Sequence, residues 1–175
     1  LGFPVSPLFG VTPKDLPERP RLGQMLRVLY VINTGKKKCG KAIDRLLAIP
    51  NVELTVTVGR YSELKEKLAR RAREHAGRLH LLGWTNQMPQ LLMRSHVVIG
   101  KAGGAAVQEA IAAKCPMIIN QVIPGQEEGN ADIIRDANIG VVVDGRKEVA
   151  RWVERLAEDG GEQWLQWRRQ MEKIS

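Results

Sequence analysis

Cysteine, histidine and long apolar runs are scarce in this sequence. Its 175 residues include two cysteines and three histidines, and none of them has a neighbour at the spacing of a zinc site. No stretch approaches the roughly 18 to 20 consecutive apolar residues of a membrane span, and no signal-peptide layout opens the chain. We therefore expect neither a disulfide framework nor a metal site, and a reducing, cytosolic setting.

Proline is unevenly distributed. Five of the nine prolines fall within the first twenty positions, which disfavours both helices and central strands there. The first residue is Leu rather than Met. We predict that residues 1–24 form an extended linker that arrives from a domain outside this chain.

From Met25 onward, short apolar runs alternate with segments of helical periodicity. This alternation is typical of a doubly wound parallel α/β sheet, whose ligands bind at the carboxyl ends of the strands. We predict such a domain over residues 25–146. Its predicted strands are 25–32, 53–59, 78–83, 96–100, 116–120 and 139–143. The predicted helices between them are 40–48, 62–75, 88–95, 104–114 and 126–138.

The tail, residues 147–175, has helical periodicity with two apolar stripes. The first stripe contains Val149, Trp152, Val153 and Leu156. The second contains Trp164, Trp167, Met171 and Ile174. We expect the first to pack on the domain; the second either does the same, covers a partner domain or touches a membrane.

The net charge of +8 favours an anionic partner, which could be a nucleic acid, an acidic membrane or a phosphorylated ligand. Aromatic residues make up 5% of the chain and are nearly absent among the basic residues. Because proteins bind single-stranded nucleic acids on aromatic platforms, we expect no nucleic-acid partner.

The first strand-to-helix turn, "NTGKKKCGKA", resembles a phosphate-binding P-loop. Gly35, Gly40 and Lys41 match that pattern, but Ala42 stands where a Ser or Thr hydroxyl would hold magnesium. No strand ends in a persuasive metal-binding Asp, and the GxGxxG fingerprint of dinucleotide sites is absent. We therefore disfavour both readings and interpret Lys36, Lys37 and Lys38 as electrostatic support for an anionic ligand or as solvated side chains.

A stronger phosphate signal lies in "HVVIGKAGGAAVQEAIAAKCP". Gly103 and Gly104 follow a strand and open a helix, whose amino terminus offers unpaired N–H groups and partial positive charge. Lys101 adds a full charge. Glu109 lies about 7 Å further along the helix axis, where a carboxylate suits the vicinal hydroxyls of a ribose.

The next strand leads into "NQVIPGQEEGNADIIRD". Its Pro-Gly turn places Gln126, Glu127 and Asn130 at the same edge of the sheet, and such side chains suit the hydroxyls of a hexose. A diphosphate and ribose site beside a sugar site describes a nucleotide sugar.

These motifs resemble the carboxyl-terminal, donor-binding domain of GT-B glycosyltransferases, which is Rossmann-like. The resemblance is to family 28, which includes the monogalactosyldiacylglycerol synthases, the processive diacylglycerol glucosyltransferases and the peptidoglycan N-acetylglucosaminyltransferase. The segments that carry it are "GFPVSP", "VTVGR", "LLGWTNQMPQLL", "VVIGKAGGAAVQEA" and "PGQEEGNA".

The resemblance implies a UDP-sugar site in which backbone near Trp84 and Thr85 holds the uracil and Glu109 the ribose. Gly103, Gly104 and the amides after them would bind the diphosphate, although Ala105 and Ala106 replace the Leu or Ile and the Thr usual there. Gln126 and Glu127 would bind the sugar, while Asn130 braces their loop. The full implied set is Gly35, Trp84, Thr85, Met88, Lys101, Gly103, Gly104, Ala105, Ala106, Glu109, Gln126, Glu127 and Asn130.

The resemblance further implies a metal-independent hexosyltransferase without cofactors that transfers galactose or glucose from a UDP-sugar to diacylglycerol. The catalytic base would come from an amino-terminal acceptor domain, so these residues alone would be inactive. We expect a cytoplasmic protein, peripheral on the anionic inner membrane leaflet. The alternatives are a peptidoglycan-type transferase, a UDP-sugar epimerase, or a non-catalytic basic module that binds lipid or nucleic acid.

Overall fold

The computed structural model describes residues 4–10, 16–33 and 38–174. Within these ranges, six strands form one sheet in the order β3-β2-β1-β4-β5-β6, and every neighbouring pair is parallel. The prediction of a doubly wound parallel sheet is therefore confirmed. The strands are β1 (Leu26–Val31), β2 (Val52–Thr57), β3 (Leu79–Leu82), β4 (Val97–Lys101), β5 (Met117–Gln121) and β6 (Gly140–Val142).

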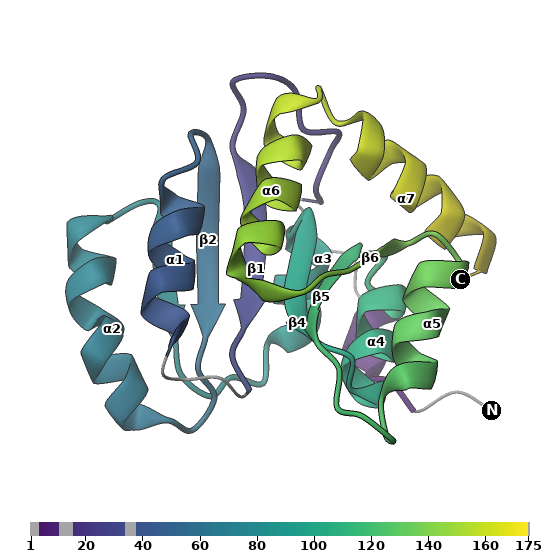
Figure 1. Cartoon of the computed structure of the whole chain (residues 1–175), viewed down its shortest axis with the longest axis horizontal. Helices are drawn as coiled ribbons and strands as arrows, with labels where there is room; N and C mark the ends of the chain where they lie inside the picture. Colours follow the sequence, from purple (N-terminus) through teal and green to yellow (C-terminus); the bar gives the residue numbers. More distant parts are fainter. Residues whose placement is uncertain (1–3, 11–15, 34–37, 175) are drawn as a thin grey trace.

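Helices cover both faces of the sheet (Figure 1). The core cluster on one face joins the sheet to α1, α2 and α6, and the cluster on the other joins it to α4 and α5 with α3. The helices are α1 (Cys39–Leu47), α2 (Ser62–Glu74), α3 (Met88–Arg94), α4 (Gly104–Ala112), α5 (Glu128–Asp136), α6 (Gly145–Glu158) and α7 (Glu162–Ile174), with a 3-10 helix, η1, at Pro7–Gly10. The elements predicted within the sheet domain lie within two residues of those observed.

The strand order reverses between β1 and β4, and doubly wound sheets bind their ligands at such a point. β1 pairs with β2 on one side and with β4 on the other, with Tyr30 opposite Ile99 near the carboxyl ends. The chain leaves β1 toward α1 on one face and leaves β4 toward α4 on the opposite face. The loops that diverge here leave room for a ligand at this edge.

The tail helices pack on the domain. Trp164, Trp167 and Met171 are buried, whereas Ile174 is 49% exposed. The Trp164 indole donates a hydrogen bond to the carbonyl of His96, the residue just before β4. Three of the four residues of the second stripe therefore fill the chain's own core at the amino-terminal edge of the sheet, opposite the ligand edge.

Part of the predicted linker lies against that same edge. Pro17 and Pro20 are buried, the His96 ring contacts the Glu18 carbonyl through Nε2 at 3.0 Å, and Arg19 Nε donates to the Gly160 carbonyl at 2.7 Å. Residues 16–20 are therefore held by the domain.

Candidate functional site

The amino terminus of α4 is open. Gly103 precedes the helix in an extended conformation, no side chain of the described residues caps the helix, and its first turn contains no acidic residue. The first N–H groups of a helix have no partner within the helix and carry partial positive charge. This helix end is therefore suited to an anion such as a phosphate.

Gly103 is not required to be glycine by its own backbone or by its neighbours. Its φ is −65°, which any residue adopts. A Cβ placed there would lie 3.5 Å from Lys101 Cε and 3.8 Å from Glu127 Oε1, which is ordinary contact. The missing side chain leaves space in front of the helix, as close approach of a ligand to the backbone requires.

Lys101 ends β4 beside this helix terminus and is paired with Glu127. Its Nζ lies 3.1 Å from Glu127 Oε1, and the lysine side chain is 29% exposed while the glutamate is 8% exposed. The second oxygen, Oε2, accepts a hydrogen bond from the Ile123 N–H at 2.9 Å. The structure thus turns Glu127 inward, where it holds both the lysine and the loop before α5.

Glu109 lies between one and two turns into α4, on the wall of a small hollow. Four of the predicted site residues line this hollow, and burial raises the pKa of Glu109. A partly buried carboxylate retains unmet hydrogen-bonding capacity, which hydroxyl donors can satisfy. The lining consists of Val31, Asn33, Met88, Leu92, Val98, Gly100, Lys101, Ala106, Glu109 and Met117.

The β5–α5 loop leaves Gln126 exposed to solvent and is held by a hydrogen bond from Asn130. Gly125 has a φ of +77°, a left-handed conformation in which glycine is favoured. Asn130 Nδ2 donates to the Ala102 carbonyl at 2.9 Å, the bracing contact expected of this residue. The exposed Gln126 is therefore held beside the β4–α4 loop.

Trp84 and Thr85 lie on the loop that follows β3. Trp84 is 63% exposed, and the Arg60 guanidinium lies 5.3 Å from the centre of its ring. The Thr85 hydroxyl oxygen accepts the Gln87 N–H at 3.0 Å, so the turn into α3 is ordered. The exposed indole and the cation form a flat surface that can stack on a base.

The first loop is only partly within the described residues. Gly35, Lys36 and Lys37 lie outside them. Lys38, exposed, directly precedes α1, so Gly40 and Lys41 fall within the helix.

A contact inside the chain accounts for Gly40. A Cβ at this position would lie 2.9 Å from Arg71 Nη2, and Arg71 Nε bonds Asp44 of α1 at 2.8 Å. The glycine therefore makes room for the Asp44–Arg71 pair that joins α1 to α2.

Sequence reasoning did not include Asn33, Arg60 and Tyr61 in the site. Asn33 lines the hollow beside Glu109, Arg60 lies over Trp84, and the Tyr61 hydroxyl donates to the Asn33 carbonyl at 3.3 Å. All three come within four residues of the end of β1 or β2. The rule that parallel strands present their carboxyl ends at one edge could have found them.

Within the ranges given above, the chain has no group of three or more His, Cys, Asp or Glu side chains that could hold a metal ion. No described helix is long and apolar enough to cross a bilayer.

Comparison with known proteins identifies a glycosyltransferase domain, the class that the sequence motifs resemble. Residues 31–173 match the family described as glycosyl transferases group 1. The processive diacylglycerol beta-glucosyltransferase of Staphylococcus carnosus (strain TM300) is 34% identical over 116 residues, which cover 66% of this chain and 29% of that protein. The enzyme of the same name from Bacillus subtilis (strain 168) is 27% identical over 166 residues, which cover 90% of this chain and 43% of that protein.

Among solved structures, Os79 from O. sativa, in complex with UDP and deoxynivalenol-3-glucoside, aligns with a TM-score of 0.68 at 16% identity, covering 87% of this chain and 37% of that one. At this identity the likeness concerns the fold, which is the α/β, Rossmann-like GT-B fold that the sequence predicts. This chain belongs to the glycosyl transferases group 1 family. It spans less than half the length of the curated relatives it matches.

Proposed function

We propose that this chain is the donor-binding part of a UDP-sugar-dependent hexosyltransferase that makes a glycolipid, with diacylglycerol as acceptor. The observation that carries the proposal is the uncapped amino terminus of α4, with open space at Gly103 and with Lys101 and Glu109 beside it. The names of the relatives supply the acceptor class and favour glucose as the sugar. Galactose stays the second candidate.

In this proposal each part of the edge binds one part of the donor. The N–H groups at Gly104, Ala105 and Ala106 bind the diphosphate, Glu109 binds the ribose hydroxyls, and Trp84 with Thr85 holds the uracil. Gln126, directed outward, binds the sugar. The inward-facing Glu127 acts by positioning Lys101 and the loop.

No metal has a role in this proposal. The partial positive charge and N–H groups at the start of α4 bind the diphosphate, and Lys101, held by Glu127, donates beside them. In other nucleotide sites magnesium binds the phosphates. UDP affinity is then expected to be the same with and without a chelator. Peripheral attachment to an anionic inner leaflet is part of the same proposal, and the +8 charge supports it.

Calorimetric titration of UDP into Glu109→Ala tests the binding role. Loss of a charge-assisted hydrogen bond costs about 1.5 to 3 kcal/mol, or about tenfold to a hundredfold in affinity. Glu154→Ala, an exposed carboxylate on α6, is the matched control and is expected to leave the affinity unchanged. Equal affinities for the two variants would contradict the assignment of Glu109.

The acceptor and the sugar are tested with the full-length enzyme. We expect transfer to diacylglycerol from UDP-glucose or UDP-galactose and not from UDP-N-acetylglucosamine. Turnover with none of the three donors would contradict the glycolipid function, while UDP binding by the present chain would remain a separate result.

A further inference from the structure

A second crevice opens at the same edge of the sheet but on the opposite face. It lies between α1 and α6 and reaches the ends of β1 and β5. Among the residues that the structure describes, none lines both this crevice and the hollow at Glu109. The proposed donor site therefore does not account for it.

The lining of this crevice is strongly cationic. Lys38 and Arg45 come from the side of α1, and Arg146 and Lys147 from the first turn of α6. Within the described residues, no carboxylate pairs with any of these four side chains, and Asp144 is the one acidic residue in the lining. Like charges gathered on one surface repel one another, and an anion bound between them relieves that repulsion.

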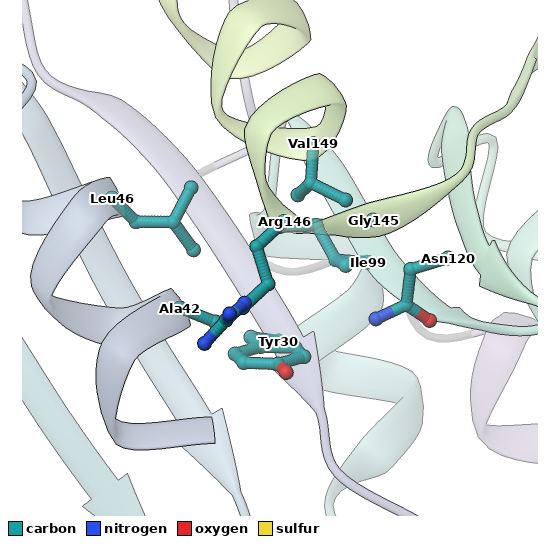
Figure 2. A pocket seen from close by; sticks show the side chains of 8 residues that line it. All are labelled: Tyr30, Ala42, Leu46, Ile99, Asn120, Gly145, Arg146 and Val149. Carbon is teal, nitrogen blue, oxygen red and sulfur yellow. The ribbon is translucent and has the colours of Figure 1, made fainter. Parts of the chain in front are cut away.

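Arg146 is the lining residue whose position most clearly indicates an anionic ligand. Its Nη1 atom is buried and has no hydrogen-bond partner among the described residues. Figure 2 shows the guanidinium extending from the start of α6 toward Tyr30, with the Asn120 side chain on the other side of Tyr30 in this view. A buried N–H without a partner is costly, and a phosphate oxygen is the acceptor that a guanidinium binds with two parallel hydrogen bonds.

The other contributors suit a phosphate as well. The Tyr30 side chain is nearly buried, and burial raises its pKa to about 12, so its hydroxyl keeps the proton that it can donate. Ala42, Leu46, Ile99 and Val149 form an apolar floor beneath these polar groups. Apolar side chains next to the charged groups lower the local dielectric constant, which strengthens charge-assisted hydrogen bonds there.

We propose that the crevice between α1 and α6 binds a phosphate group distinct from the donor diphosphate, with Arg146 as its main ligand and Tyr30, Asn120, Arg45 and Lys147 around it. The phosphate belongs either to a lipid headgroup or to a soluble phosphate ester. This inference is independent of the proposed function, because its residues and its face of the sheet are separate.

The test measures phosphate binding to the whole chain in the presence of saturating UDP. Glycerol 3-phosphate is titrated by calorimetry, and vesicles of phosphatidylcholine with and without phosphatidic acid are tested by co-sedimentation. We expect Arg146→Gln to weaken binding about tenfold or more. Arg151→Gln, which removes an exposed charge of the same kind from the same helix, is expected to leave it unchanged.

The outcomes separate the two sources and the two sites. Binding of glycerol 3-phosphate identifies a soluble ester, and binding only to vesicles that contain phosphatidic acid identifies a headgroup. Arg146→Lys, which keeps the charge and loses the two-pronged geometry, is expected to bind with intermediate strength and guards against misfolding of the glutamine variant.

The proposal is overturned if neither probe binds, if the Arg146 and Arg151 variants bind equally, or if UDP displaces the probe. UDP affinity, measured separately, is expected to be equal in all these variants.

Discussion

At the scale of single residues, Glu127 shows how a side chain at a ligand edge can serve the fold. Its two carboxylate oxygens bond Lys101 and the Ile123 N–H. The sequence placed it at the right edge but could not give its direction, because an N-terminal glutamate of a helix can point toward a ligand or back into the loop. In the proposed donor site we therefore expect Glu127 to position Lys101 and the loop rather than to contact the sugar.

We predict that Glu127→Ala lowers the free energy of unfolding by about 1 to 3 kcal/mol, because it leaves a part-buried N–H and a cation without their acceptor. Chemical denaturation measures this value. Glu128→Ala, which removes an exposed carboxylate that accepts the Gly125 N–H, is the control and is expected to cost less. Equal losses in the two variants would mean that burial of Glu127 contributes nothing.

His96 makes stability depend on pH. Burial, and to a smaller extent the positive charge of Arg27, lowers the pKa of His96 from 6.5 to about 4. The neutral ring accepts the Arg27 N–H at Nδ1 and contacts the Glu18 carbonyl through Nε2. As the pH falls, the histidine of the unfolded chain is protonated before the buried His96 of the folded chain. The contribution of His96 to the free energy of unfolding is therefore complete above pH 6.5 and is lost as the pH falls toward 4.

This loss amounts to about 3 kcal/mol. Denaturation at a series of pH values from 7 to 4 measures it, and in His96→Gln the part of the slope above pH 5 is expected to disappear. A slope that is unchanged in the variant would assign the pH dependence to other groups.

At the scale of elements, the turn between α6 and α7 anchors residues 16–20. Gly160 and Gly161 both have positive φ, and a Cβ at Gly161 would lie 2.7 Å from the Pro20 carbonyl oxygen, whereas one at Gly160 would meet nothing within 4 Å. The linker contacts both glycines, through the Arg19–Gly160 hydrogen bond and through packing on Gly161, but only a Cβ at Gly161 would collide with it.

We predict that Gly160→Ala costs about 1 to 2 kcal/mol of stability through backbone strain alone. Gly161→Ala is expected to cost about 1 to 3 kcal/mol more, because the added methyl group displaces the linker segment. Thermal unfolding of the pair measures the difference. Equal losses would indicate that residues 16–20 are not held in solution as the structure shows.

The elements themselves were largely predictable. Central strands such as Val97–Lys101 are nearly continuous apolar runs because both faces are buried, and helices such as Ser62–Glu74 reveal their inward residues, Leu64 and Leu68, by their spacing. The packing partner of the last helix was not predictable, because the spacing of Trp164, Trp167 and Met171 indicates only that one face of the helix is apolar. What covers that face depends on the sheet edge around His96, which is distant in sequence.

At the scale of the whole molecule, the fold uses the two faces of one sheet edge differently. The β4–α4 side presents a helix terminus, glycine and a carboxylate, and the α1–α6 side presents four cations around Tyr30. The first group was predictable because its residues are near in sequence and follow strand ends. The second was not, because Tyr30, Asn120 and Arg146 come from β1, β5 and α6, which are distant in sequence.

The most direct test of the central claim, that the α4 terminus binds the donor diphosphate, is a calorimetric titration of UDP into Gly103→Ala. The structure accommodates the added methyl group at 3.5 Å from its nearest neighbour, so stability is expected to change by no more than about 1 kcal/mol. UDP affinity is expected to fall by about tenfold or more, since the methyl group occupies the path of the phosphate. Unchanged UDP affinity in a stable Gly103→Ala variant, or no UDP binding by the unaltered chain, would contradict the account.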